Sequence, residues 1–264
     1  MGRIRADAAL VESGVFASRE RARAAILAGD VRIGDQPVTK AGQQVEEGTV
    51  FEVTPRQQYV SRGGLKLAGA LDTFGIQPAG LRVIDVGAST GGFTDCVLQR
   101  GAASVTAVDV GYGQLAWSLR TDPRVTVLER TNIRSVEGPL PGAPFDMAVI
   151  DVSFIALVKV LPHVREQLDE SSQVVALVKP QFEAGKGRVG KHGVVRDPEV
   201  HMDVLRAVSV AAAELGWVVR GMTFSPLKGP EGNIEFWIWL AGSGEATGDT
   251  PETVVAAARE VLGG

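Results

Sequence analysis

The sequence predicts an α/β protein in which a Rossmann-like, mostly parallel sheet with one antiparallel strand follows a small N-terminal α+β domain. Apolar strand-like runs alternate with helical stretches from residue 60 onward, which is typical of a parallel sheet covered by helices on both faces. The last two runs, 217–223 and 234–240, break this alternation, because the Pro- and Gly-rich segment between them is too short for a crossover helix. These two strands must therefore be antiparallel neighbours.

The N-terminal domain, residues 1–54, combines two helical patterns with short β-like runs. Ser18 is a preferred N-cap residue and Gly29 a preferred helix terminator, so they bound the second helix. The expected elements are helices over 6–15 and 19–28, then strands at 31–33 and 50–53. Residues 55–60 are polar and are expected to form a linker.

The second domain is expected to span residues 61–242. Its pattern predicts strands at 82–86, 104–108, 125–128, 145–150, 173–178, 217–223 and 234–240, and helices around 64–74, 91–100, 155–168 and 199–215. Residues 243–264 are expected to form an acidic C-terminal tail or helix.

Composition excludes several classes of protein. The 264-residue chain has a net charge of −4, so any nucleic-acid site must be a local basic patch. The single cysteine, Cys96, can form no internal disulfide, and no cysteine cluster offers a zinc site; we expect no metal. The N-terminus lacks the pattern of a signal peptide, and no apolar run is long enough to cross a membrane. We therefore expect a cytoplasmic protein, either a monomer or a weak dimer.

The densest motif is Val83-Ile-Asp-Val-Gly-Ala-Ser-Thr-Gly-Gly-Phe-Thr94, a strand that runs through glycines directly into a helix. Glycines let the backbone approach a ligand, and the helix N-terminus offers unpaired N–H groups. The next strand ends in Asp109, which is well placed to accept hydrogen bonds from a ribose. This arrangement indicates a nucleoside-containing cofactor.

Three other interpretations of this motif compete with a nucleoside cofactor. One is a glycine-rich turn needed only for packing, and another is a nicotinamide site, although a strict G-x-G-x-x-G is missing. The third is a hydrolase nucleophile elbow, because Gly87-Ala-Ser-Thr-Gly91 matches G-x-S-x-G, but no histidine follows in the expected place. Acidic residues at the ends of both strands fit S-adenosylmethionine best. The expected cofactor-binding residues are Asp85, Gly87, Ala88, Ser89, Gly91, Gly92, Phe93, Asp109, Val110 and Asn132.

Charged residues gather where three strands are expected to meet. Asp151 and Lys179 each follow a predicted parallel strand, and ligands of such sheets bind at the carboxyl ends of the strands. Glu235 enters the final antiparallel strand, whose beginning lies at the same edge, and Lys66 opens the preceding helix toward it. A carboxylate in so apolar a strand is costly unless it is paired or functional. The set is either two structural salt bridges or a catalytic site.

A resemblance favours the catalytic interpretation. The segments Ser61-Arg-Gly-Gly-Leu-Lys66, Ile150-Asp-Val-Ser-Phe-Ile155 and Leu177-Val-Lys-Pro-Gln-Phe-Glu183, together with the glycine motif, resemble the TlyA (haemolysin-A-like) family of rRNA 2′-O-methyltransferases. The Lys66, Asp151, Lys179 and Glu235 set is similar to that of the wider FtsJ-like ribose methyltransferases. The resemblance covers residues 3 to about 240 and implies methylation of cytidine ribose in ribosomal RNA or ribosomal subunits, with S-adenosyl-L-methionine as donor.

The chemistry suggests a role for each of the four residues. A ribose hydroxyl is a poor nucleophile at neutral pH, so the enzyme must position the oxygen and take its proton. Lys179 is the best candidate base, and Asp151 and Glu235 are expected to orient the lysines. Lys66 is expected either to hold the target nucleotide or to help stabilise the developing alkoxide. The alternatives are a non-enzymatic RNA-binding or ribosome-assembly protein and, as the family's haemolysin name suggests, a cytolysin.

Basic residues outside this set are candidates for RNA contact. The stretch from Ser18 to Asp35 resembles the S4-type RNA-binding domain, although charge alone equally describes a solvated helix face. The glycine-rich, basic segment 183–193 is either a flap that clamps RNA phosphates or a disordered loop. The expected RNA-binding residues are Arg3, Arg5, Arg19, Arg23, Lys40, Arg62, Arg130, Lys186 and Arg188.

Overall fold

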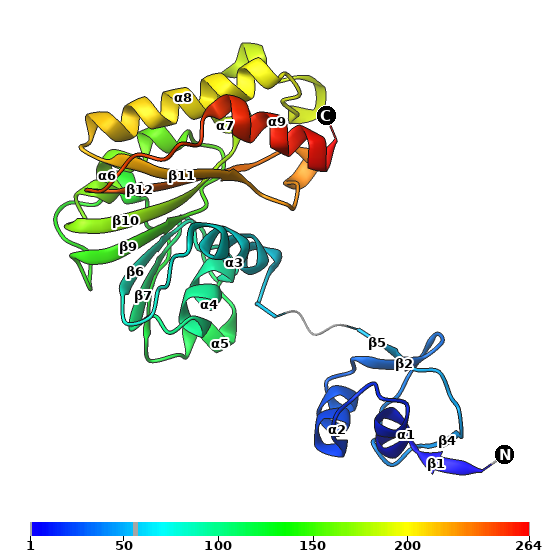
Figure 1. Cartoon of the computed structure of the whole chain (residues 1–264). Helices are drawn as coiled ribbons and strands as arrows, with labels where there is room; N and C mark the ends of the chain where they lie inside the picture. Colours follow the sequence, from blue (N-terminus) through cyan, green and yellow to red (C-terminus); the bar gives the residue numbers. More distant parts are fainter. Residues whose placement is uncertain (1, 55–57, 264) are drawn as a thin grey trace. The chain divides into compact units, whose positions relative to one another are not determined.

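The computed structural model describes residues 2–54 and 58–263, except the side chains of Lys186 and Pro230. The chain divides into two compact units, Met1–Gln57 and Gln58–Gly264, which are considered separately (Figure 1). Half of the expected linker, 55–57, lies outside the described residues. Tyr59, within the other half, is buried in the core of the second unit.

The first unit packs two helices against short strands. Ser18 caps α2 as expected, since its hydroxyl accepts a hydrogen bond from the backbone N–H of Arg21. The elements are β1 (Arg3–Arg5), α1 (Ala6–Glu12), α2 (Arg19–Leu27), β2 (Val31–Ile33), β3 (Gln36–Pro37), β4 (Gln44–Glu46) and β5 (Glu52–Val53). Strand β1 pairs with β4, and β2 pairs with β3 and β5, all antiparallel. The pattern did not predict β1, β3 or β4, because two or three residues are too few for a period to register.

The second unit is built on a seven-stranded sheet in the order β11-β12-β10-β9-β6-β7-β8. Its strands are β6 (Arg82–Val86), β7 (Ser104–Val108), β8 (Val125–Leu128), β9 (Phe145–Ile150), β10 (Leu168–Val178), β11 (Val218–Phe224) and β12 (Phe236–Ala241). Only β12 runs antiparallel to its neighbours, β10 and β11. The predicted parallel sheet with one antiparallel strand is confirmed.

Helices cover both faces of this sheet (Figure 1). The side chains of α3 (Arg62–Phe74), α4 (Gly92–Gln99) and α5 (Trp117–Arg120) belong to one apolar core. Those of α6 (Leu161–Arg165), α8 (Pro198–Glu214) and α9 (Pro251–Leu262) belong to the other. Successive strand residues feed the two cores alternately, as Val83 and Ile84 do. Both faces are therefore buried, which is why the strands read as continuous apolar runs.

The expected single helix over 155–168 is wrong. The structure has a 3₁₀ turn, η2 (Leu157–Lys159), then the short helix α6, with Pro162 in its first turn. Strand β10 begins at Leu168, which pairs with Phe145 of β9, five residues before the predicted start of this strand at 173. A register shift between Leu168 and Gln173 separates this start from the apolar part of the strand.

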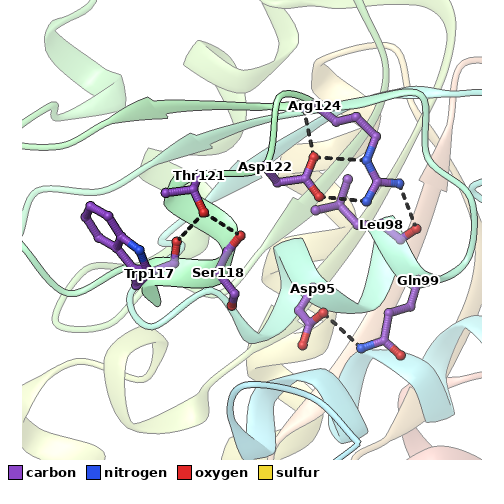
Figure 2. A network of polar contacts seen from close by, with 8 residues as sticks. All are labelled: Asp95, Leu98, Gln99, Trp117, Ser118, Thr121, Asp122 and Arg124. Atoms are coloured by element: carbon purple, nitrogen blue, oxygen red, sulfur yellow. Dashed lines mark hydrogen bonds and ion pairs between the residues drawn. The ribbon is translucent and has the colours of Figure 1, made fainter.

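Hydrogen bonds and an ion pair hold α4 and the turn between α5 and β8 in place (Figure 2). The Arg124 guanidinium forms an ion pair with Asp122 (2.7 Å) and reaches the Leu98 carbonyl, while Gln99 donates to Asp95 (2.9 Å). Asp95 also accepts the backbone N–H of Val60 (2.8 Å). These contacts fix the helix that begins at the glycine loop.

Two further features complete this unit. Short 3₁₀ turns, η3 (Lys186–Arg188) and η4 (Lys191–Gly193), lie within the glycine-rich segment after α7 (Pro180–Glu183). Helix α9 buries Val254, Val255 and Ala258 against the α8 side of the sheet. Among the helices of the described residues, none is both long and apolar enough to cross a membrane.

Candidate active site

The glycine loop turns sharply at the end of β6. Gly87 has φ 88°, and a Cβ there would lie 2.3 Å from the Asp151 carbonyl oxygen, so only glycine fits. The backbone N–H of Asp151 in turn donates to the Val86 carbonyl (3.0 Å). The loop and the end of β9 are therefore packed backbone to backbone, which places Asp151 beside the loop.

Asp109 anchors the far side of this loop. Its carboxylate accepts the backbone N–H of Ser89 (2.7 Å) and that of Gly111 (2.6 Å). Two amide donors hold the carboxylate in one orientation, with lone pairs left for a ligand. The adjoining cavity, of about 360 Å³, is mainly apolar; Gly87, Ser89, Asp109, Val110 and Asn132 are among its lining residues.

The other predicted cofactor residues lie elsewhere in the structure. Ala88, Gly92 and Phe93 line a second cavity, described below. Asp85 and Gly91 line neither cavity: Asp85 is fully buried and accepts the Thr94 hydroxyl (2.6 Å). Burial raises the pKa of Asp85 to about 7. A Cβ on Gly91 would lie 2.3 Å from a Leu119 methyl, so that glycine serves packing.

Two lysine–carboxylate pairs converge at the sheet edge. Lys66 of α3 pairs with Glu235 (2.5 Å), and Lys179, after β10, pairs with Asp151 (2.5 Å), after β9. The strand register explains the meeting, because Val178 lies opposite Phe236, and β9 and β10 are parallel neighbours. All four residues line a cavity of about 380 Å³. The sequence-predicted set is thus brought together.

The second cavity adjoins the first. Gly87, Ser89 and Asp151 line both, so the two share a wall at the glycine loop. The two cavities therefore lie next to each other at the glycine loop.

Sequence reasoning missed two residues of this region. The Ser153 hydroxyl oxygen accepts a hydrogen bond from the Lys179 ammonium (2.9 Å), which gives that lysine a second oxygen partner. Lys228, in the loop before β12, lines the second cavity together with Arg62. Ser153 belongs to the segment Ile150–Ile155, two residues after Asp151. This closeness to Asp151 in the sequence is the signal that could have indicated Ser153.

A third cavity, of about 510 Å³, opens on the other side of Lys179 and Glu235. Phe154 and Phe182 lie in its lining with ring centroids 5.2 Å apart. Asn233 holds one wall, since its amide donates to the Gly193 carbonyl (2.9 Å) and accepts the N–H of Val195 (3.0 Å).

Glu183 tethers the loop that carries Ser153 and Phe154. Its carboxylate accepts the backbone N–H of Leu157 (2.5 Å), at the start of η2. Burial raises its pKa to about 7, although hydrogen bonds from the backbone of Leu157 and Val158 oppose the rise. This contact links α7 to the loop whose Ser153 and Phe154 line the first and third cavities.

The basic residues predicted in the first unit lie at its surface. Arg5 and Arg19 share the buried carboxylate of Asp7 (3.0 Å each), and these contacts, that of Arg5 foremost, lower the pKa of Asp7 to about 2. The remaining predicted residues there are exposed: Arg3, Arg23 and Lys40. Asp7 thus fixes the two guanidinium groups while leaving their outer edges to solvent.

The predicted basic residues of the second unit differ in environment. Arg62 is exposed, and the Arg130 guanidinium lies over the Tyr112 ring, 4.2 Å from its centroid. Arg188 forms an ion pair with Asp203 of α8 (2.7 Å), which attaches the glycine-rich segment to that helix. The side chain of Lys186 lies outside the described residues.

The hydrolase interpretation finds no support in this geometry. The Ser89 hydroxyl donates to the Gln114 side chain (3.2 Å), and no histidine lines either cavity around Ser89 in the described residues. A nucleophile elbow needs a base within hydrogen-bond reach of its serine.

Comparison with known proteins identifies a family for each unit of the chain. A family model for FtsJ-like methyltransferases matches residues 59–241, and one for S4 domains matches residues 4–51. The 16S/23S rRNA (cytidine-2′-O)-methyltransferase TlyA of Mycobacterium tuberculosis is 50% identical over 240 residues, 90% of each chain. A provisionally named rRNA methyltransferase of Bacillus subtilis is 49% identical over 94% of this chain and 90% of its own. The solved structure of a provisionally named hemolysin from Streptococcus thermophilus superimposes with a TM-score of 0.74 at 41% identity, covering 99% of this chain and 98% of its own.

Proposed function

The chain belongs to the TlyA family of FtsJ-like methyltransferases, and on that premise we propose that it methylates the ribose 2′-hydroxyl of a cytidine in ribosomal RNA. One observation carries the proposal: the cavity lined by both lysine–carboxylate pairs shares lining residues with the cavity lined by Asp109. Donor and acceptor sites must touch in a transfer enzyme, because the reacting atoms have to approach in line. Since ribosomal RNA is the acceptor, we propose that the protein acts in the cytoplasm.

The first cavity fits S-adenosylmethionine, the donor used by this family. The Asp109 carboxylate, held by two backbone N–H groups, suits the ribose hydroxyls, and Asn132 lies in the lining where an adenine would extend. The apolar lining suits the adenine ring. When bound, the donor supplies a methyl group on positively charged sulfur, already activated for transfer.

The lysine–carboxylate pairs supply the acceptor chemistry. In the reaction the 2′-oxygen gains the methyl group as the carbon–sulfur bond breaks, and the hydroxyl proton passes to Nζ of Lys179. Asp151 and Ser153 orient that amine, at 2.5 and 2.9 Å.

Lys66 and Glu235 form the opposite, more deeply buried pair. Glu235 is 0% exposed and aligns Lys66, whose ammonium faces the same cavity. A positive charge held there stabilises the negative charge that develops on the 2′-oxygen. The third cavity, beside Lys179 and Glu235, offers room for the base of the target nucleotide, with Phe154 and Phe182 in its lining.

The test is methyl transfer from labelled S-adenosylmethionine into ribosomal RNA, followed by digestion to nucleosides. We expect the label in 2′-O-methylcytidine with the full chain and its absence with Lys179→Ala. Tight RNA binding without any transfer would favour the ribosome-assembly alternative, and label on a base atom would contradict the ribose assignment.

A further inference from the structure

The catalytic cavity has more positive than negative charge. Four cations line it, Arg62, Lys66, Lys179 and Lys228, against two carboxylates, those of Asp151 and Glu235. Each carboxylate forms an ion pair with one lysine, Glu235 with Lys66 and Asp151 with Lys179. Within residues 2–54 and 58–263, neither Arg62 nor Lys228 has a carboxylate within 4.0 Å. The cavity therefore carries an excess of two positive charges, which the proposed chemistry does not use.

Lys228 is held at this cavity by the loop on either side of it. Before it, the buried Ser225 hydroxyl donates to the Leu227 carbonyl (2.8 Å). After it, the Gly229 N–H donates to the Asn233 carbonyl (2.9 Å), and a Cβ on Gly229 would lie 2.2 Å from Oε1 of Glu235. The backbone next to Lys228 thus packs directly on the catalytic carboxylate. Its ammonium has one long contact, with the Gly263 carbonyl (3.5 Å), which a stronger anionic partner would displace.

The substrate offers such partners. A ribose within a chain is flanked by two phosphates of one negative charge each, and the 2′-hydroxyl is on the carbon next to the one that bears the 3′-phosphate. When that hydroxyl lies at Lys179, at least one phosphate must lie in or at the mouth of the same cavity. Phosphate contacts fix the register of a nucleic acid without reading its sequence.

We propose that Lys228 and Arg62 form a phosphate clamp that holds the phosphodiester groups flanking the target ribose. The proposal rests on the proposed function, since the position of the ribose follows from the role of Lys179. Arg62 offers the planar fork that suits a phosphate and Lys228 a point charge. Lys228 is thus a substrate-positioning residue, brought from the β11–β12 loop to the N-terminus of α3. A competing anion, the carboxylate of the methyl donor, is disfavoured because Lys228 does not line the cavity served by Asp109.

The experiment compares Lys228→Ala and Lys228→Arg with the full wild-type chain. Lys159→Ala, an exposed lysine on η2 outside these cavities, is the matched control. RNA binding is measured at several salt concentrations without the donor, methyl transfer at saturating donor, and donor affinity by calorimetry. For Lys228→Ala we expect about tenfold weaker RNA binding, a salt slope lower by about one, and a rise in KM by a larger factor than any fall in kcat. Lys228→Arg should recover most of the affinity.

Two results would overturn the clamp. One is an RNA affinity and salt slope in Lys228→Ala equal to those of Lys159→Ala. The other is weakened donor binding with RNA affinity intact, which would assign Lys228 to the donor carboxylate. Because RNA binding is measured without chemistry, a wild-type chain that binds RNA but transfers no methyl group would refute the proposed function and leave the clamp to be judged on the salt slopes.

Discussion

The sheet edge and the N-terminal unit hold their cations in opposite ways. At the edge, the Lys66 and Lys179 side chains are each 11% exposed, and each has its own carboxylate. In the N-terminal unit, Arg5 and Arg19 are 46% and 56% exposed and share one buried carboxylate, Asp7. Paired, shielded lysines suit proton transfer at a fixed atom, whereas exposed arginines with surplus charge suit capture of a polyanion. Chemistry and capture should therefore be separable by mutation.

The largest effect is expected at Lys179. General-base assistance is typically worth about 10²–10⁴-fold, so Lys179→Ala should lose at least about 10²-fold in single-turnover methylation rate. Donor binding, measured by calorimetry, should be retained, because Asp109 lies in the other cavity. Equal losses of rate and donor affinity would place Lys179 in the donor site.

A smaller effect is expected at Asp109. Removing a carboxylate that accepts charge-assisted hydrogen bonds should weaken donor binding by roughly 1.5–3 kcal/mol in Asp109→Ala. Because Asp109 also holds the N–H groups of Ser89 and Gly111, Asp109→Asn is the matched variant that keeps an acceptor. Calorimetry that finds unchanged affinity in both variants would remove Asp109 from the cofactor site.

Replacing the N-terminal arginines should affect RNA binding alone. Replacing Arg19 and Arg23 together should lower the salt slope of RNA binding, since each lost phosphate contact lowers it by about one. The donor affinity should stay that of the wild type. A slope that does not move would show that this helix face is solvated and not in contact with RNA.

The smallest effects concern pH, and the two units should respond with opposite sign. The pKa of Glu183 is raised to about 7 from 4.5, so between these values the folded chain holds a proton that the unfolded chain has lost, and stability falls as pH rises. The pKa of Asp7 is lowered from 3.8 to about 2, so its contribution is present above about pH 4 and is lost as pH falls toward 2. Urea unfolding of Glu183→Gln should show a flatter pH dependence between pH 5 and 7. Asp7→Asn should leave that range unchanged and alter the acid limb.

Strand ends explain how much of the site the sequence could predict. Asp151 and Lys179 were placed together because both follow adjacent parallel strands, and Glu235 because the final strand had to be antiparallel. These strand directions follow from the rules of sheet geometry, so they can be predicted without knowing how the side chains pack. The four residues that we propose as catalytic could therefore be brought together from the sequence alone.

The missed features depend on tertiary contacts. Lys228 lines the cavity because the Gly229 backbone packs on Glu235. The spacing of apolar residues in the sequence does not predict such a tertiary contact. The burial of Asp7 beneath Arg5 and Arg19 was hidden for a similar reason, since an acidic residue in a first helical turn is usually a solvated one. The single helix expected over 155–168 is wrong because the chain forms a 3₁₀ turn at Leu157–Lys159 and starts a new, short helix with Pro162 in its first turn.

The most direct test of Lys179 as base is the methylation rate of Lys179→Arg at saturating RNA and donor. A guanidinium keeps the positive charge but cannot give up its proton at accessible pH. We predict a rate at least about 10²-fold below that of the wild type, with donor and RNA affinity retained. A near-normal rate would contradict the base assignment and leave Lys179 as a fixed positive charge beside Asp151.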